Sequence, residues 1–190
     1  MKRFAIFVSG SGTNMENILQ KIREGRIEAE AALVVSDNPG APALKRAEKF
    51  KVECAVVDRK KFSSREEFEA EIEQNLARKK IDYIVLAGFM RILSPGFVRA
   101  RRLRILNIHP ALLPKFPGAH AIREAWEAKV KVTGVTVHFV DEGVDTGPII
   151  LQREVPIEAN DTLETLEKKI HAVEYELYPE AIHRVLSGNL

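Results

Sequence analysis

The chain lacks the features that mark secreted, membrane-spanning and nucleic-acid-binding proteins. Its 190 residues include a single cysteine, which excludes an intrachain disulfide and a metal site built from cysteines. The formal charge of +2 is too small and too evenly spread to form the basic surface that nucleic acid requires. The longest apolar runs, such as 83–87, have the length of a strand and are far too short to span a membrane. We therefore expect small-molecule partners, no nucleic acid, no membrane and a reducing, cytoplasmic location.

Two short segments carry patterns that can be mistaken for functional signals. Residues 1–9 place basic side chains before an apolar stretch, but the stretch is short and leads directly into a glycine loop. A first strand is therefore expected there in place of a secretory signal. Cys54 lies in the apolar segment 52–57, which favours a small buried side chain over a nucleophile.

Segments typical of strands and of helices alternate along the chain. A length of 190 residues suits one α/β unit, and no linker or repeat divides it. The alternation predicts a single Rossmann-like domain over 1–190, with a mostly parallel seven-stranded sheet that helices cover on both faces. Strands are expected at 4–9, 31–36, 54–57, 83–87, 103–107, 135–140 and 149–155. Helices are expected at 15–24, 42–50, 65–79, 95–101, 121–128 and 162–186.

Capping residues set the expected ends of several helices. Asn14 is the expected N-cap of the first helix, and Gly25 can end that helix. The pattern Ser-x-x-Glu at 64–67 is that of a capping box before the third helix. Ser94 and Pro95 are typical of the cap and first turn of a short fourth helix.

The loop at 9–14, Ser-Gly-Ser-Gly-Thr-Asn, joins the first strand to the first helix. In this fold class ligands bind beyond the carboxyl ends of the strands, where the strand order reverses. The glycines allow close approach to the backbone, and amides at a helix start favour an anion such as phosphate. Met15 stands where the dinucleotide fingerprint requires a third glycine, and the Walker ending is missing, so a phosphomonoester fits better than NAD or ATP. A tight turn that binds nothing stays open as the alternative.

The segment 104–118 is the most informative part of the chain. A strand-like run at 104–106 leads to Asn107 and His109, which project to the same side of an extended backbone. Pro110, Pro114 and Pro117 restrict the following loop and would hold both polar groups in place. This pattern favours chemistry at the two residues. A strand end whose histidine caps a neighbouring backbone group is the alternative.

Two further loops are expected near the same edge of the sheet. The loop at 88–95 is unusually apolar, so a flat apolar ligand could lie against it, although packing of the loop on the core is the simpler interpretation. The loop at 140–148 contains Asp141, Glu142 and Asp145 in a spacing that matches no zinc or EF-hand site, so a metal is not expected. It favours a turn, or a carboxylate that tunes a catalytic histidine. His138 alternates with apolar neighbours and is expected to be a core histidine, with support of the site as the alternative.

Together these loops resemble one family. Over nearly its whole length the sequence is similar to the folate-dependent formyltransferases, through Gly-Ser-Gly-Thr-Asn at 10–14, Ala-Gly-Phe-Met-Arg-Ile-Leu at 87–93, Asn-Ile-His-Pro-Ala-Leu-Leu-Pro at 107–114 and Asp-Glu-Gly-Val-Asp-Thr-Gly-Pro at 141–148. The Asn107, His109 and Asp145 set alone marks the wider superfamily. The phosphate loop and the compact length narrow the resemblance to the phosphoribosylglycinamide formyltransferases, also called glycinamide ribonucleotide transformylases, of purine synthesis.

The resemblance implies formyl transfer from 10-formyltetrahydrofolate, a co-substrate, to the amine of 5-phosphoribosylglycinamide, without a metal. The implied catalytic residues are Asn107, His109 and Asp145. The implied ribonucleotide contacts are Gly12, Thr13, Asn14, His171 and Glu174. The implied folate contacts are Arg65, Met90, Arg91, Ile92, Leu93, Asn107, Asp141, Val144 and Asp145. The amino-terminal part would then receive the ribonucleotide and the carboxyl-terminal part the folate, in a monomer or a homodimer.

Such a reaction explains why these residue types are grouped. Attack of an amine on the formyl carbon places negative charge on an oxygen, which Asn107 and a protonated His109 can meet as donors. Free imidazole titrates near pH 6.5, so a neighbouring anion is needed to keep it charged at neutral pH. Asp145 is the candidate anion, in direct contact or through one water, and His109 could then help to pass a proton to the departing N10.

Three other functions compete with this interpretation. Hydrolysis of the formyl-folate would use water in place of the amine, but such enzymes usually carry an additional amino-terminal domain, and none is expected before Met1. A nucleotide-sensing domain without activity would have no use for an Asn–His–Asp set. Formylation of transfer RNA is disfavoured because no basic extension follows Leu190.

Overall fold

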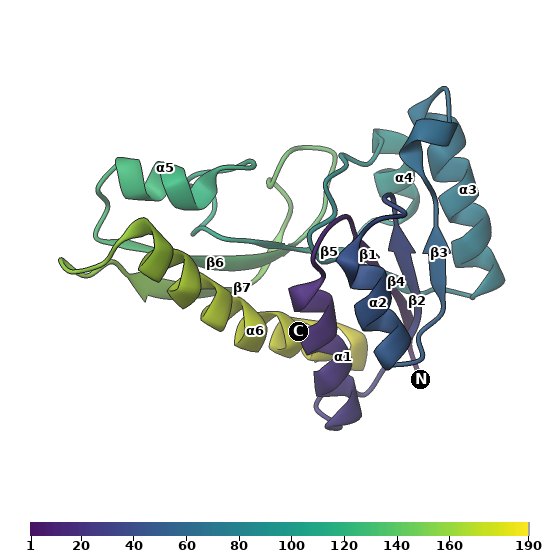
Figure 1. Cartoon of the computed structure of the whole chain (residues 1–190), viewed down its shortest axis with the longest axis horizontal. Helices are drawn as coiled ribbons and strands as arrows, with labels where there is room; N and C mark the ends of the chain where they lie inside the picture. The colour runs from purple at the N-terminus through teal and green to yellow at the C-terminus, as the bar shows by residue number, and fades with distance from the viewer. Residues whose placement is uncertain (190) are drawn as a thin grey trace.

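The computed structural model describes residues 1–189; Leu190, the last residue of the expected domain, lies outside the described residues. Within residues 1–189, seven strands form the sheet: β1 (Arg3–Val8), β2 (Glu30–Ser36), β3 (Cys54–Val56), β4 (Tyr83–Leu86), β5 (Ile105–His109), β6 (Val132–Phe139) and β7 (Ile149–Pro156) (Figure 1). The helices that connect them are α1 (Thr13–Arg23), α2 (Pro42–Lys49), the short 3-10 helix η1 (Arg59–Lys61), α3 (Arg65–Arg78), α4 (Pro95–Ala100), α5 (Ala121–Glu127) and α6 (Leu163–Ser187).

The strands form one sheet in the order β3-β2-β1-β4-β5-β6-β7. The five strands from β3 to β5 pair in parallel, whereas β5 with β6 and β6 with β7 pair antiparallel. The prediction of a mostly parallel seven-stranded sheet is therefore confirmed. The order reverses between β1 and β4, and this reversal is where an α/β fold leaves room for a ligand.

Alternation of side chains along β1 builds a separate core on each face of the parallel sheet. Phe4, Ile6 and Val8 belong to one apolar cluster, which α1, α2 and α6 cover. Ala5 and Phe7 belong to the other cluster, which α3 and α4 cover. The alternation follows from the two-residue period of a strand, and helices lie on both faces as predicted.

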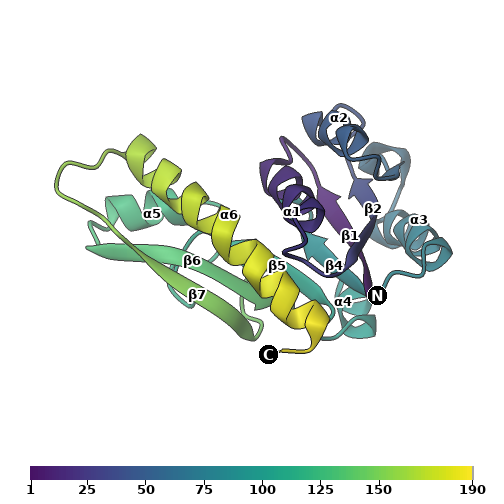
Figure 2. The ribbon, with the colours of Figure 1, turned by 90° about the horizontal axis from the view of Figure 1, so that it is seen from below.

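The antiparallel end of the sheet is covered differently. The long helix α6 runs diagonally across β6 and β7 on one face, as Figure 2 shows. On the other face the loop that follows β5 packs directly on β6. A Cβ atom at Gly134 would lie 2.5 Å from Leu112 Cδ2, so only glycine allows this loop to approach so closely. The loop that follows the Asn107–His109 strand is thereby held against the sheet.

Two predicted boundaries near the candidate site are wrong. The first helix begins at Thr13 and not at 15, because Gly12 adopts a left-handed conformation (φ 72°) and occupies the N-cap position in place of Asn14. The fifth strand was expected at 103–107 but covers Ile105–His109. It continues because Ile108 and His109 pair with the antiparallel strand β6, a partner that the local sequence does not reveal.

The remaining capping predictions are confirmed, with one exception. Gly25 follows α1 with φ 73°, and the hydroxyl of Ser94 caps α4 by accepting from Phe97 N. The hydroxyl of Ser64 likewise caps α3. The second half of the capping box is wrong, since the Glu67 carboxylate accepts from the backbone and hydroxyl of Ser63 instead of the Ser64 amide.

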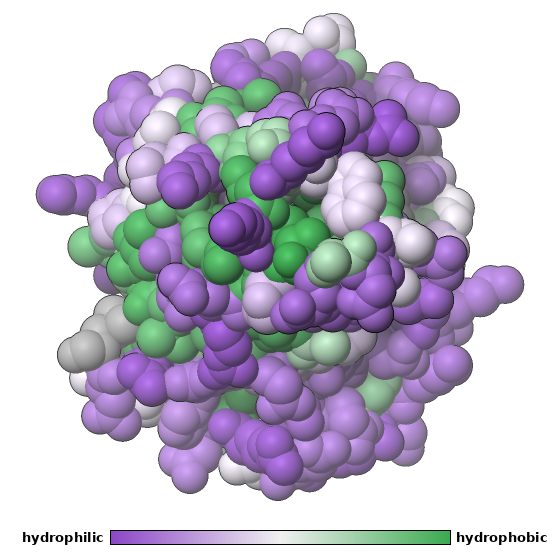
Figure 3. Space-filling view, turned by 90° about the vertical axis from the view of Figure 1, so that its left-hand side faces the viewer, coloured by the Kyte–Doolittle hydropathy of each residue, from purple (hydrophilic) through white to green (hydrophobic). Residues whose placement is uncertain are grey.

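The end of the molecule around α5 and the start of α6 exposes apolar side chains. Figure 3 shows them gathered in the middle of this face and ringed by hydrophilic residues. Ile122 and Trp126 of α5 are partly buried and pack against the core beneath. None of the helices within residues 1–189 is both long and apolar enough to cross a membrane.

Tyr178 connects the core to the edge of the sheet that carries the candidate site. It is fully buried on α6, and its hydroxyl donates to the carbonyl oxygens of Leu86 at 2.7 Å and Leu106 at 3.1 Å. Burial raises the pKa of this hydroxyl well above its usual range, so it stays a donor at every physiological pH. One hydroxyl therefore ties the last residue of β4 to the second residue of β5.

We expect Tyr178→Phe to lower the free energy of unfolding by about 1 to 3 kcal/mol, because two buried carbonyl groups lose their shared donor. Urea unfolding would measure the change. Tyr175→Phe is the matched control on the same helix, since the Tyr175 hydroxyl makes no hydrogen bond within residues 1–189. Equal stability of the Tyr178→Phe and wild-type proteins would contradict the assignment.

Candidate active site

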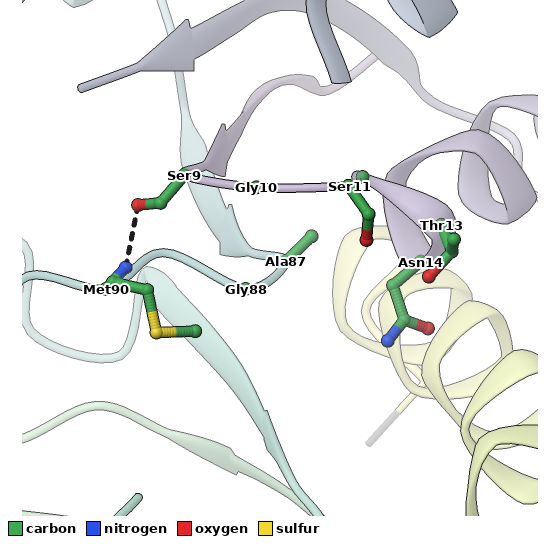
Figure 4. Close-up of a pocket in the computed structure, with 9 residues that line it drawn as sticks. Ser9, Gly10, Ser11, Thr13, Asn14, Ala87, Gly88 and Met90 are labelled. Atoms are coloured by element: carbon green, nitrogen blue, oxygen red, sulfur yellow. Dashed lines mark hydrogen bonds between the residues drawn. The ribbon is translucent and has the colours of Figure 1, made fainter. Parts of the chain in front are cut away.

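The candidate site lies where the strand order reverses, between the loops that follow β1 and β4. Ser9 joins the two loops, because its amide donates to the Gly88 carbonyl at 3.1 Å and its hydroxyl accepts from Met90 N at 2.8 Å. Figure 4 shows the loops facing each other, with the Ser9–Met90 bond on one side and Asn14 on the other. The two loops thus form a single frame.

A cavity of about 210 Å³ lies within this frame. It is lined by Ser9, Gly10, Ser11, Gly12, Thr13, Asn14, Ala87, Gly88 and Met90. These residues offer backbone amides, hydroxyl groups and an amide side chain, but no lysine or arginine. Gly12 is required here for a further reason: a Cβ at this position would lie 2.5 Å from Ala43 Cβ of α2. The cavity therefore suits a small anion held by neutral donors at the start of α1.

Asn14 of α1 meets two side chains of α6, His171 and Glu174, beside this cavity. The Asn14 amide nitrogen lies 3.3 Å from Glu174 Oε2, and His171 Nδ1 lies 2.8 Å from the same oxygen. Glu174 is buried, whereas His171 is exposed at the surface. Asn14 Oδ1 is buried without a hydrogen-bond partner in residues 1–189, so it can accept from a ligand. The structure brings together all the predicted ribonucleotide-binding residues.

A second group lies at the end of β5, where Leu86 of β4 pairs with Asn107. His109 Nδ1 lies 3.4 Å from Asp145 Oδ2, and His138 Nε2 lies 3.5 Å from Asp145 Oδ1. The Asn107 amide nitrogen lies 3.2 Å from His138 Nε2. Both histidines are buried. The predicted trio of Asn107, His109 and Asp145 therefore does converge, and the Asp145 carboxylate lies beside the His109 ring without an intervening residue.

His138 is buried, as expected of a core histidine, and it also belongs to this group, which is the alternative that the sequence left open. Its Nδ1 donates to the Phe139 carbonyl at 2.9 Å, and its Nε2 faces both the Asn107 amide nitrogen and Asp145 Oδ1. His138 lies directly across from Asn107 in the antiparallel β5–β6 pair. Only this register, which alternation along β6 does not specify, could have revealed the contact.

His109 has an acceptor at each ring nitrogen. Its Nε2 donates to the Phe116 carbonyl at 2.7 Å, while Nδ1 faces Asp145. This arrangement suits an imidazolium, which donates from both nitrogens. The bond to Phe116 also means that His109 does cap a backbone group, the alternative that the sequence left open.

Asp145 is held in place by the loop after β5 and by its own turn. The Gly118 amide donates to Asp145 Oδ2 at 2.8 Å, and the Asp145 backbone is left-handed with φ 54°. The preceding Asp141 closes the turn by accepting from Gly143 N and the Thr146 hydroxyl. Burial acts to raise the pKa of Asp145, but contacts with His138, Gly118 N and His109 outweigh it and lower that pKa. Asp145 is therefore an anion at neutral pH.

Large apolar side chains on the loops of the site are exposed to solvent. Met90 and Ile92 are 74% and 72% exposed, and Val144 on the facing loop is 55% exposed. The interpretation of 88–95 as a loop packed on the core is therefore wrong for Met90 and Ile92, although Leu93 is buried. Exposed apolar groups of this size favour a flat apolar ligand.

The two predicted arginines have different surroundings. Arg91 turns to Asp37 at the end of β2, with 2.6 Å between its Nε and the buried carboxylate. Its Nε is therefore committed to Asp37, while the rest of the guanidinium group stays partly exposed. Arg65 is exposed at the first turn of α3. Cys54 is half-buried, and burial raises the pKa of its thiol, as expected for a cysteine that is not a nucleophile.

Comparison with known proteins identifies the family. The sequence pattern of the formyl transferase family matches residues 2–182. The chain belongs to the formyltransferase family.

The relatives of this formyltransferase include a protein of similar length and a much longer trifunctional protein. It is 44% identical to the phosphoribosylglycinamide formyltransferase of Bacillus subtilis, over the whole chain and 97% of that protein. It is 45% identical to the trifunctional purine biosynthetic protein adenosine-3 of Drosophila melanogaster, where 98% of the chain matches 14% of the longer protein. The crystal structure of phosphoribosylglycinamide formyltransferase from Bacillus halodurans superposes with a TM-score of 0.94 at 53% identity, covering 98% of this chain and 96% of that one.

Within residues 1–189 of the formyltransferase, no group of three or more His, Cys, Asp or Glu side chains is arranged to hold a metal ion.

The ion pair of His171 with Glu174 is the clearest electrostatic feature beside the anion cavity. The hydrogen bond to Glu174 raises the pKa of His171 above its ordinary value, against the opposing effect of partial burial.

We expect His171 to titrate above the ordinary histidine value of about 6.5, and Glu174→Gln to lower its pKa. Because the pKa is raised in the folded protein, the stabilisation from this pair is complete below the unfolded value and is lost as the pH rises through the folded one. An NMR pH titration of the imidazole signals would measure both, with His171→Gln identifying the signal. An unchanged His171 titration in Glu174→Gln would refute the assignment.

Proposed function

We propose that this formyltransferase transfers the formyl group of 10-formyltetrahydrofolate to the amine of 5-phosphoribosylglycinamide in de novo purine synthesis. The observation that carries the proposal is the register of β4 with β5. Leu86, directly before the cavity-lining Ala87 and Gly88, pairs with Asn107, and this neighbourhood supports a reaction between a ligand in the cavity and the Asn107, His109 and Asp145 group. The name of the Bacillus subtilis relative supports the same reaction.

The amino-terminal part receives the ribonucleotide in this proposal. Gly12, Thr13 and Asn14 bind its phosphate through backbone and side-chain donors at the start of α1. Glu174, already in contact with Asn14 and His171, accepts from the ribose hydroxyl groups, and a charged His171 adds attraction for the phosphate. The absence of lysine and arginine from the cavity lining makes His171 the cation best placed for this task.

The carboxyl-terminal part and the loop after β4 receive the folate. The exposed Met90, Ile92 and Val144 side chains provide apolar surface for the pterin and benzoyl rings, and Leu93 supports them from beneath. The backbone of Arg91, of Asp141 and of Asp145 supplies hydrogen bonds to the pterin edge. Arg65, which is exposed, attracts the glutamate carboxylates of the folate tail.

The chemistry uses direct attack of the substrate amine on the formyl carbon. The resulting tetrahedral species carries negative charge on the formyl oxygen, and the second N–H of Asn107 and an N–H of His109 donate to it. The attacking amine loses a proton and N10 of the folate gains one, with His109 acting in the transfer. Asp145 provides the counter-charge for the imidazolium, and His138 orients Asn107.

Substrate binding must change one contact of the free protein. His109 Nε2 donates to the Phe116 carbonyl, so this donor reaches the formyl oxygen only when that bond is exchanged for the substrate. The exchange costs little because one hydrogen bond replaces another.

The proposal requires no metal, since an amide and an imidazolium meet the charge. It includes a cytoplasmic location and leaves monomer and homodimer open.

The direct test is an assay of the purified protein with both substrates. We expect formylated ribonucleotide to appear in step with loss of 10-formyltetrahydrofolate, because the proposal couples the two. Lack of formylated product would refute the function. Equal turnover of the folate with and without the ribonucleotide would instead support hydrolysis.

The role of His109 has a test of its own. We expect His109→Ala to lower kcat by about 100- to 1,000-fold through loss of a transition-state donor. His183→Ala on α6 is the matched control, since His183 makes no side-chain hydrogen bond or ion pair within residues 1–189 and its loss should leave kcat unchanged. Retention of most activity in His109→Ala would contradict the proposed role of His109, although the proposed reaction itself could still hold.

A further inference from the structure

A buried carboxylate that the proposed reaction does not use lies behind the loop after β4. Glu69, on α3, is 5% exposed. Its Oε1 accepts from Ser94 N at 2.6 Å, and its Oε2 accepts from the Ser94 hydroxyl. Both oxygens of the carboxylate are thus committed to one residue, and charged acceptors form stronger hydrogen bonds than neutral ones.

Ser94 is the point where the loop ends and α4 begins. Its hydroxyl has one proton, which goes to Glu69, and this orients an oxygen lone pair toward Phe97 N, 3.2 Å away. The contact with Glu69 therefore fixes the N-cap of α4 as well as the end of the preceding segment.

The segment 90–94 has two other anchors at its opposite end. Met90 N donates to the Ser9 hydroxyl, and the Arg91 side chain is held by Asp37. The side chains of Met90 and Ile92 in this segment are exposed to solvent. A short segment fixed at both ends, with apolar groups exposed between, presents a ligand surface that needs no ordering when the ligand arrives.

We propose that Glu69 is a positioning residue, which holds segment 90–94 in the shape that receives the folate. The identity of the ligand rests on the proposed function, whereas the anchoring does not. Glu69 does not touch the substrates. It acts through Ser94, so its loss should weaken folate binding and leave the ribonucleotide side intact.

Glu73 offers a matched control. It lies one turn further along α3, and both of its oxygens accept from Arg101, which follows α4. Glu73→Gln therefore removes a similar contact between the same two helices, but at the end of α4 that is distant from segment 90–94.

The experiment compares Glu69→Gln, Glu73→Gln and wild type by calorimetric titration with tetrahydrofolate and, separately, with ribose 5-phosphate. We expect Glu69→Gln to weaken tetrahydrofolate binding about tenfold, through loss of a charged hydrogen bond and of the fixed loop. Ribose 5-phosphate binding should not change, and Glu73→Gln should alter neither ligand. If Glu69→Gln fails to fold, Ser94→Ala, which keeps the backbone donor, should show the same ligand selectivity.

Amide hydrogen exchange without ligand tests the anchoring by itself. We expect the amides of segment 90–94 to exchange faster in Glu69→Gln than in Glu73→Gln. Unchanged exchange in Glu69→Gln, or equal weakening of both ligands, would overturn the positioning role. If the wild-type protein does not bind tetrahydrofolate, the proposed function fails, and the exchange rates still decide whether Glu69 anchors the segment.

Discussion

The parallel pairing of β1 with β4 is the constraint on which both halves of the candidate site depend. Because the two strands run in the same direction, their following loops leave the sheet at one edge and meet. Ser9 then bonds one loop to the other, and the anion cavity forms between them. The next strand, β5, is in register with β4, so Asn107 and His109 reach the same edge. A change in strand order would separate the cavity from the histidine cluster.

Buried carboxylates hold residues around this edge. Asp37 holds Arg91, Glu69 holds Ser94, and Glu174 holds Asn14 and His171. Burying a carboxylate is costly unless donors meet it, so Asp37 and Glu69 each hold one position of the loop after β4, whereas Glu174 ties α1 to α6. The apolar side chains of Met90, Ile92 and Val144, by contrast, are exposed. Polar contacts thus fix the backbone of the site, while apolar side chains form part of its exposed surface.

Much of the fold follows from the sequence because the relevant signals are local. Alternating strand and helix segments, the Ser94 cap and the glycine after α1 all act within a few residues, and the structure matches them. The error in the capping box is local, because Glu67 bonds to Ser63. The left-handed backbone of Gly12 sets the start of α1, and pairing with the distant strand β6 extends β5 through His109. The contact of His138 with Asn107 could not be predicted from the local sequence either, since it depends on the register between two strands.

By itself, the sequence determined which residue types could do the chemistry: a glycine loop for an anion, an amide and an imidazole two residues apart, and a distant acid. These are properties of side chains and of local backbone geometry, so they can be read along the chain. Only the tertiary structure decided that Asp145 faces His109, that Phe116 accepts from the same ring, and that Glu69 lies behind the loop after β4. His109 is 7 residues from Phe116 and 36 from Asp145, and Glu69 is 25 residues from Ser94. Packing and strand register set the geometry of these contacts, and no local pattern encodes either.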